Sequence, residues 1–364
     1  MRTLFTLATL LAALAAAAGP GLAADSLVVL AASSAGRIEA FEAATMYHIG
    51  TFTVGKKVES VSASPDGRRL YVAQEDPSTP GSCCSLFTLN LATREMCLLT
   101  SPALFGSPSP DGGLLFTQGK SGVDVFDARR LTRVTTMKAP GAYNLQASPD
   151  GRWLLGITNS PKPSLDIFSV PAGAMAHQLP IPDGPATGAW AGDRYYVFTY
   201  GAGGPLLWQV RPEDAELSNL GAVRLPELYS RCNEPVLLML TGAWDRLFLA
   251  EVFGFSVDRR NACPDAALGG IYEIRPSAGD AHRIAGPLHV SRMLASPDGR
   301  DLYVLESSGQ RAKGVDRLVR IDTGSGSVVQ TAQLETGRWT LTLVHMPLNL
   351  IPQGKERAVT YCSR

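Results

Sequence analysis

Short apolar runs, each introduced by a polar turn, follow one another along most of the chain. The clearest example is SPDGRRLYVA at residues 64–73, where four turn-forming residues lead into an apolar and aromatic run. Proline presets the first turn residue, aspartate bonds to the backbone ahead of it, and glycine allows a positive φ. The stretch therefore predicts a tight turn between two strands, a structural repeat and not a catalytic motif.

The same pattern returns at a regular interval. Full copies begin at Ser109, Ser148 and Ser296, and eroded copies begin at Gly192 and Trp244. The aspartates that mark the turns stand at positions 66, 111, 150, 193, 245 and 298, so the steps are 45, 39, 43, 52 and 53 residues. Repeats of roughly 40 to 50 residues with several short strands are typical of a β-propeller, whereas a helical solenoid would need apolar residues at helical spacing.

Each repeat is interpreted as a blade of up to four strands. The fullest example has strands at 58–63, 70–74, 86–91 and 95–99. Later strands are expected at 114–118, 123–127, 133–138, 153–158, 165–170, 176–181, 195–199, 206–210, 247–251, 270–275, 302–305, 318–322 and 328–334.

The two ends of the chain determine how the ring closes. Strands are expected at 27–31, 37–41 and 47–54, before the first repeat, and at 339–344, after the last one. If the last strand completes the first sheet, the open sheet edges disappear. The prediction is an all-β, seven-bladed β-propeller of four-stranded antiparallel blades, with six or eight blades as the alternatives.

The N-terminus has the features of a secretory signal peptide. Residues 1–24 contain Arg2, an apolar run at 4–18 and small residues before a cleavage point. The run is too short to span a bilayer permanently, with a retained anchor as the alternative. Residues 25–364 are then a single propeller domain, periplasmic or secreted. With 33 basic and 33 acidic residues the net charge is zero, so no general electrostatic case exists for nucleic acid or an anionic membrane surface.

Six cysteines in an exported chain favour disulfides. They are Cys83, Cys84, Cys97, Cys232, Cys263 and Cys362. A cross-strand bridge from Cys83 or Cys84 to Cys97 is expected. Cys232 and Cys263 would close the long loop at 253–268, and Cys362 would take the remaining member of the Cys83 and Cys84 pair. The usual metal-ligand spacing is missing, because there is no CxxC pair with a nearby histidine.

The repeats at 64–73 and 296–305, with the strand LVRID at 318–322 and the turn TGSG at 323–326, resemble the YVTN-type family of seven-bladed propellers. The motif specifies the scaffold and says little of chemistry. In its export signal, blade count and polar insertion at 75–85, the chain is also similar to the heavy, propeller-forming subunit of periplasmic amine dehydrogenases. That resemblance implies a supporting subunit with no cofactor of its own, since the quinone cofactor would lie on a smaller partner chain.

In propellers of this strand order, the loops that enter the innermost strand and leave the second strand gather on one face, around the central channel. Polar and aromatic residues of these loops are the candidates for binding a small polar ligand or a partner chain, although loops are often polar only because they are solvated. They are Lys57, Glu75, Tyr143, Asn144, Tyr200, Glu251, His289, Arg292, Glu306 and Trp339.

Catalytic residues cannot be assigned. Glu75, Glu251 and Glu306 each follow the second strand of a different blade and could form an acid or cation site, in outline like that of the calcium-dependent lactonase propellers. The coordinating pattern of those enzymes is not matched residue by residue. The five histidines are scattered, and GxSxG, HExxH, P-loop and CxxCH motifs are missing.

Two functional hypotheses follow. The first is a binding or assembly propeller, such as the supporting subunit of an amine dehydrogenase. The second is a stand-alone propeller enzyme, such as a metal-dependent lactonase or hydrolase. Bound metal with hydrolysis of esters or lactones would favour the enzyme, and copurification with a small cofactor-bearing chain would favour the subunit.

Overall fold

The computed structural model describes most of the chain beyond the predicted signal peptide. The described residues are 25–75, 84–119, 121–139, 143–158, 162–182, 186–201, 204–223, 237–243, 245–252, 269–276, 280–288, 290–306, 317–335, 339–354 and 356–362. Within these ranges there is no helix with the length and apolar character needed to cross a membrane. The predicted signal peptide, residues 1–24, lies outside them.

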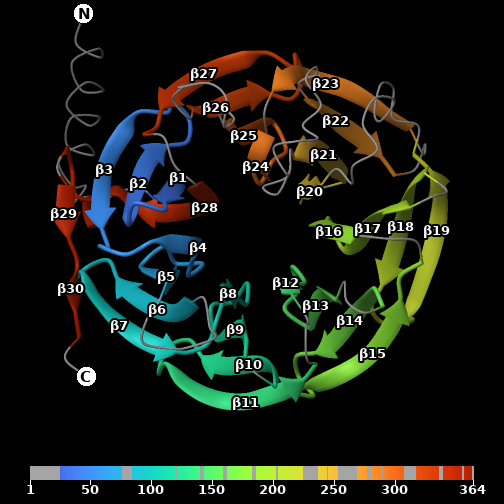
Figure 1. The fold of residues 1–364 in the computed structure, drawn as a ribbon, viewed down its shortest axis with the longest axis horizontal. Coiled ribbons are helices and arrows are strands. Elements are labelled where there is room, and N and C mark those ends of the chain that lie inside the picture. The colour runs from blue at the N-terminus through green and yellow to red at the C-terminus, as the bar shows by residue number, and fades with distance from the viewer. Residues whose placement is uncertain are drawn as a thin grey trace, which may run out of the picture.

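Seven antiparallel blades stand radially around one axis and form a ring (Figure 1). They are numbered here in chain order and described from the axis outwards. Among the described residues they form six hydrogen-bonded sheets, because a parallel bridge between Val252 and Val290 joins blades 6 and 7. Blades 1 to 4 comprise β28 (Trp339–Pro347), β1 (Asp25–Ser33), β2 (Arg37–Glu42) and β3 (His48–Thr53); β4 (Val58–Ala63), β5 (Arg69–Glu75), β6 (Cys84–Asn90) and β7 (Glu95–Thr100); β8 (Gly106–Pro108), β9 (Leu114–Gln118), β10 (Gly122–Asp127) and β11 (Thr132–Lys138); and β12 (Tyr143–Ala147), β13 (Trp153–Thr158), β14 (Ser164–Ser169) and β15 (Ala174–Pro180).

The remaining three blades follow the same order. Blades 5 to 7 comprise β16 (Ala186–Ala191), β17 (Arg194–Gly201), β18 (Gly204–Arg211) and β19 (Glu216–Ala222); β20 (Leu237–Ala243), β21 (Arg246–Val252), β22 (Gly269–Arg275) and β23 (Asp280–Leu288); and β24 (Val290–Ala295), β25 (Asp301–Glu306), β26 (Arg317–Asp322) and β27 (Val328–Gln333). The prediction of seven four-stranded blades is confirmed, and the alternatives of six or eight are wrong.

The first blade joins the two ends of the chain, as the sequence predicted. The C-terminal strand β28 is its innermost strand and pairs with β1 over nine residue pairs, from Asp25 opposite Pro347 to Ser33 opposite Trp339. The ring is thus closed by backbone hydrogen bonds and has no open edge at the junction.

The core is divided into apolar layers between adjacent blades. Seven clusters of buried residues occur in the described part of the chain, one at each contact between neighbours. The second strand of each blade contributes side chains to the two apolar layers on either side of that blade. In β5, Leu70 and Val72 face blade 1, whereas Tyr71 and Ala73 face blade 3. Successive side chains of a strand point to opposite faces, so every residue of an apolar run such as LYVA is buried.

The Ser-Pro-Asp-Gly turns join the first two strands of their blades. In blade 4, the Ser148 hydroxyl donates to Asp150 Oδ1 at 2.6 Å and accepts from the Trp153 amide at 2.9 Å. The Arg152 amide also donates to Asp150 Oδ1, at 3.0 Å, and Gly151 has a φ of 71°. The turns at 64–69, 109–114 and 296–301 repeat these contacts. The motif is therefore structural, as predicted.

The turns also lie against each other around the ring. A Cβ added to Gly112 of blade 3 would lie 3.4 Å from Cδ of Pro65 in blade 2, and one added to Gly151 of blade 4 would lie 3.9 Å from Cδ of Pro110. The glycine of one turn thus faces the proline of the preceding turn. In this way the repeat serves both the turn within a blade and the contact between blades.

Residues 348–362, called here the C-terminal strap, continue beyond β28 along the outside of blades 1 and 2 (Figure 1). The strap begins with the 3-10 helix η1 (Leu348–Leu350). Strand β29 (Glu356–Ala358) then pairs in parallel with β3, and β30 (Thr360–Tyr361) pairs in parallel with β7. These two blades therefore have five strands, which the sequence analysis did not predict.

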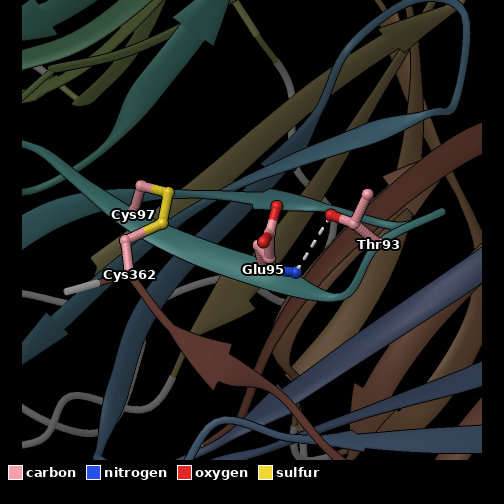
Figure 2. Close-up of a disulfide and its surroundings, with 4 residues drawn as sticks. All are labelled: Thr93, Glu95, Cys97 and Cys362. Carbon is pink, nitrogen blue, oxygen red and sulfur yellow. Dashed lines mark hydrogen bonds between the residues drawn. A yellow bond between two sulfur atoms is a disulfide. The ribbon is translucent and has the colours of Figure 1, made fainter.

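The strap corrects the predicted disulfide pairing. Cys97 of β7 is bonded to Cys362, with 5.0 Å between the two Cα atoms (Figure 2). The residue opposite Cys97 on β6 is Thr88, four positions from Cys84, which is about 13 Å along a strand. The predicted bridge from Cys83 or Cys84 to Cys97 is therefore wrong, as is the predicted pairing of Cys362 with the remaining one of Cys83 and Cys84. Cys84 is in a disulfide of its own, and Cys83, Cys232 and Cys263 lie outside the described residues.

Two glycines in equivalent turns test the role of the ring closure. Gly67 and Gly112 have φ of 63° and 68°, so alanine at either position is strained, by about 1 kcal/mol. At Gly67 the new Cβ would also lie 2.1 Å from the carbonyl oxygen of His345 in β28. We expect Gly67→Ala to lower the free energy of unfolding by about 3 kcal/mol and Gly112→Ala by about 1 kcal/mol, measured by urea titration. Equal losses would show that β28 does not restrict the turn.

The aspartate of the turn predicts a dependence of stability on pH. Burial disfavours the charged form of Asp150, but hydrogen bonds from Ser148 and Arg152 outweigh it and lower its pKa to about 2. In the unfolded chain an aspartate has a pKa of about 3.9. The contribution of the Asp150 carboxylate to stability is therefore complete above about pH 4 and is lost as the pH falls towards 2.

We expect Asp150→Asn to melt below the wild type at pH 5, and the gap in melting temperature to narrow as the pH approaches 2. Asp193→Asn is the matched control, since Asp193 occupies an eroded turn with its side chain 96% exposed. A gap for Asp150→Asn that stays constant over this range would contradict the assignment.

Candidate functional site

One end of the ring carries those predicted binding residues that the structure describes. At this end, which we call the entry face, the chain enters the inner strand of each blade and leaves the second strand. The Glu75 amide donates to the Lys57 carbonyl oxygen at 3.0 Å in blade 2, and Glu306 is paired with Val290 in blade 7. Asn144 and Arg292 lie near the starts of the inner strands β12 and β24. The topology thus places the described members of the predicted set at one end of the propeller.

The structure describes these residues to different extents. Side chains are described for Lys57, Glu75, Asn144, Arg292 and Glu306. For a further four residues only the backbone is described: Tyr143, Tyr200, Glu251 and Trp339. His289 lies outside the described residues. Side-chain roles for these five stay predictions.

Arg292 lies at a β-bulge in the inner strand of blade 7. The register between β24 and β25 shifts between Val290 and Arg292, with Ser291 as the extra residue. The Ser291 hydroxyl donates to the Leu305 carbonyl oxygen at 3.1 Å, which fixes the bulge. Arg292 Nη1 donates to the Ser291 carbonyl oxygen at 2.8 Å, its one hydrogen bond among the described residues. Bulges redirect side chains and often occur next to binding sites.

Burial lowers the pKa of the Arg292 guanidinium, and the negative charge of Glu59 partly opposes this. Glu59 belongs to β4, two blades further around the ring, and β28 is the inner strand between them (Figure 1). The ordinary pKa of a guanidinium is so high that Arg292 stays charged even after this decrease. The lowered pKa therefore indicates a cation that is held partly out of water, with no carboxylate in contact among the described residues.

Glu59 forms an ion pair with Lys57 and was not predicted as a site residue. It too lies at a bulge, because the register of β4 against β5 shifts between Val58 and Ser60. The side chains of Lys57 and Glu59 are each about one-third exposed. The spacing of Lys57 and Glu59 at the start of an inner strand is a signal that could have identified the pair. Together with Arg292 they leave one net positive charge.

A buried glutamine supports the loop that carries Lys57. Gln74 is fully buried at the end of β5, and its Nε2 donates to the carbonyl oxygens of Val54 and Lys56 at 3.2 and 3.3 Å. A buried amide with both functions satisfied fixes the backbone around it. Gln74 could not be identified from the sequence, because a glutamine within a strand carries no distinctive pattern.

The three predicted carboxylates are not shown to converge. Glu306 forms an ion pair with Arg317 across β25 and β26, so its charge is already compensated. Glu75 is exposed, and the side chain of Glu251 is outside the described set. The described residues contain no group of three histidine, cysteine, aspartate or glutamate side chains suited to a metal ion.

Asn144 differs from the other candidates in its backbone. It is exposed and has a φ of 54°, in the left-handed region, which asparagine adopts more readily than most residues. The register of β12 against β13 is irregular between Tyr143 and Gln146. Blades 2, 4 and 7 thus each have an irregular inner strand at the entry face.

Comparison with known proteins identifies a fold and no family. No protein-family profile matches the chain, and no curated protein matches its sequence. Among solved structures, it is similar to the hydrazine synthase of Kuenenia stuttgartiensis, with 12% identity and a TM-score of 0.56 over 79% of this chain and 95% of that chain.

Two further solved structures show the same likeness. The dihydro-heme d1 dehydrogenase NirN, in complex with DHE, has 14% identity and a TM-score of 0.56, over 89% of this chain and 76% of that chain. A functionally unknown protein from Desulfotomaculum acetoxidans has 12% identity and a TM-score of 0.61, over 88% of this chain and 99% of that chain. At these identities the likeness shows the β-propeller fold alone.

Proposed function

We propose that this chain is an exported binding propeller whose entry face binds an anionic group of a ligand or partner chain. The observation that carries the proposal is Arg292, a partly desolvated cation near the axis. A guanidinium has five N–H donors, and only one hydrogen bond of Arg292 is made within the described residues. The other donors match a carboxylate or phosphate, which they can bind in a bidentate geometry.

The neighbouring charges agree with an anionic ligand. Lys57 and Glu59 neutralise each other, so Arg292 is the uncompensated charge among these three residues. The negative charge of Glu59 offsets part of the positive charge of Arg292, which favours a single anionic group over a highly charged polymer as the ligand. The chain's zero net charge points the same way, because selectivity then depends on the local site.

If the anionic group belongs to a protein, the entry face binds a partner chain. The resemblance to amine dehydrogenase heavy subunits suggests a small, quinone-bearing chain, whose acidic side chain would contact Arg292. The cofactor would then belong to that partner, and this chain would act as a supporting subunit in the periplasm.

Substitution of Arg292 tests the proposal. We expect Arg292→Ala to weaken binding of citrate or inorganic phosphate at least tenfold, measured by calorimetry, with the melting temperature within about 2 °C of wild type. Arg292→Lys keeps the charge but loses the bidentate geometry, so it should bind with intermediate affinity.

Arg130→Ala is the matched control, because Arg130 is 82% exposed in the turn between β10 and β11, away from the entry face. It should bind as the wild type does. The proposal fails if the wild type binds neither anion and copurifies with no cofactor-bearing chain, or if Arg292→Ala retains full affinity. Unfolding of Arg292→Ala would assign the side chain to the core instead.

A further inference from the structure

The C-terminal strap reaches from the outer edge of blade 2 into its interior. The Tyr361 hydroxyl donates to the Val54 carbonyl oxygen at 2.6 Å and lies 2.8 Å from Gln74 Oε1. Its ring packs edge-on against Phe87, with 5.9 Å between the centroids. Tyr361 is 42% exposed overall, yet its hydroxyl contacts a glutamine that is fully buried. One side chain of the strap therefore connects the outer surface to the polar interior of the blade.

The atoms that Tyr361 contacts hold the loop at residues 54–57 in place. The Val54 carbonyl oxygen accepts from both Tyr361 and Gln74, and the Lys56 carbonyl oxygen accepts from Gln74. The amides of Val54 and Gly55 donate to the Gly36 carbonyl oxygen at 2.8 and 3.2 Å. This loop leads directly to Lys57 and to Glu59, whose charge acts on Arg292.

The last residues of the strap, beyond β29, are held by few backbone contacts. In β30 only Thr360 and Tyr361 pair with β7, and the Cys362 amide donates to the Met96 carbonyl oxygen at 3.0 Å. A pairing this short is marginal in water. The Cys97–Cys362 disulfide fixes its register covalently (Figure 2). Cys362 is exposed, so a dithiol can reach the bond.

We propose that Tyr361 is a positioning residue for the loop at 54–57 and that the Cys97–Cys362 disulfide keeps Tyr361 in contact with this loop. The part of the entry face formed by Lys57 and Glu59 is then sensitive to reduction of the disulfide. In the reductive step, a thiolate of a dithiol attacks one sulfur and breaks the bond, and its second thiol completes the exchange. Two electrons pass to the protein, Cys97 and Cys362 each end as thiols with one proton, and the dithiol becomes a disulfide. The strap then loses its covalent anchor.

Hydrogen exchange of the peptide containing residues 54–57 tests the positioning role without any ligand. Tyr361→Phe removes the hydroxyl and keeps the ring against Phe87, so we expect exchange at Val54 and Gly55 to accelerate at least threefold, with blades 4 to 6 unchanged. The control is Tyr47→Phe, at an exposed tyrosine outside the strap, which should change nothing here. Unchanged exchange in Tyr361→Phe, or equal acceleration in every blade, would overturn the inference.

The redox part is tested with dithiothreitol and with the double variant Cys97→Ser/Cys362→Ser. We expect either treatment to accelerate exchange in the same peptide at least as much as Tyr361→Phe does. Further reduction of the double variant should have no added effect there, which separates this bond from the disulfide of Cys84. Equal acceleration by dithiothreitol in the wild type and in the double variant, or acceleration in neither protein, would refute redox control through this bond.

An effect of the strap on anion binding rests on the proposed function. The positioning role of Tyr361 and the proposed function can nevertheless fail separately. We expect Tyr361→Phe to weaken citrate or phosphate binding about threefold to tenfold, with Tyr47→Phe as wild type. If the wild type binds no anion but the exchange results hold, the proposed function is wrong and the positioning role stands. If Tyr361→Phe changes exchange but leaves a measurable anion affinity unaltered, the strap does not regulate binding.

Discussion

The fold depends on the burial of both faces of the second strand in each blade. Runs such as LYVA in β5 and LYVL in β25 place alternate side chains in two different apolar layers. A single sheet cannot cover both of its faces, so each blade requires a neighbour on either side. A row of blades would leave two faces exposed at its ends. Only a closed ring satisfies every blade, and the pairing of β28 with β1 supplies that closure.

The two ends of the ring differ: one carries the regular turns of the scaffold, and the other carries the candidate site. Four turns with the same Ser-Pro-Asp-Gly hydrogen bonds form the end opposite the entry face, where each copy repeats the contacts of the last. The entry face lacks this regularity, because three inner strands have register shifts there. Arg292 and Glu59 lie at two of these irregular positions. Departures from the repeat, more than the repeat itself, thus mark where a ligand or partner would be recognised.

Much of the fold could be predicted from the sequence, because the second and third strands are long apolar runs preceded by turn residues. The inner strands of blades 3 to 7 were missed, since segments such as GSP and ATGAWA are short and rich in small residues. The candidate site could be predicted only as a face. Arg292 was predicted from its loop position, whereas Glu59 and Gln74 depend on a bulge and on contacts between distant residues. The disulfide was mispredicted because nothing in the sequence shows the strap crossing β7.

The closure strand has a consequence for how the molecule is made. The innermost strand of the first blade is β28, so that blade is incomplete until residue 347 has been synthesised, more than 300 residues after its own second strand. Contacts between such distant segments form slowly, because a long loop must be ordered before they are gained. During that interval β1 presents a bare edge and an uncovered apolar face. Such an edge favours self-association of the emerging polypeptide until its final blade strand arrives.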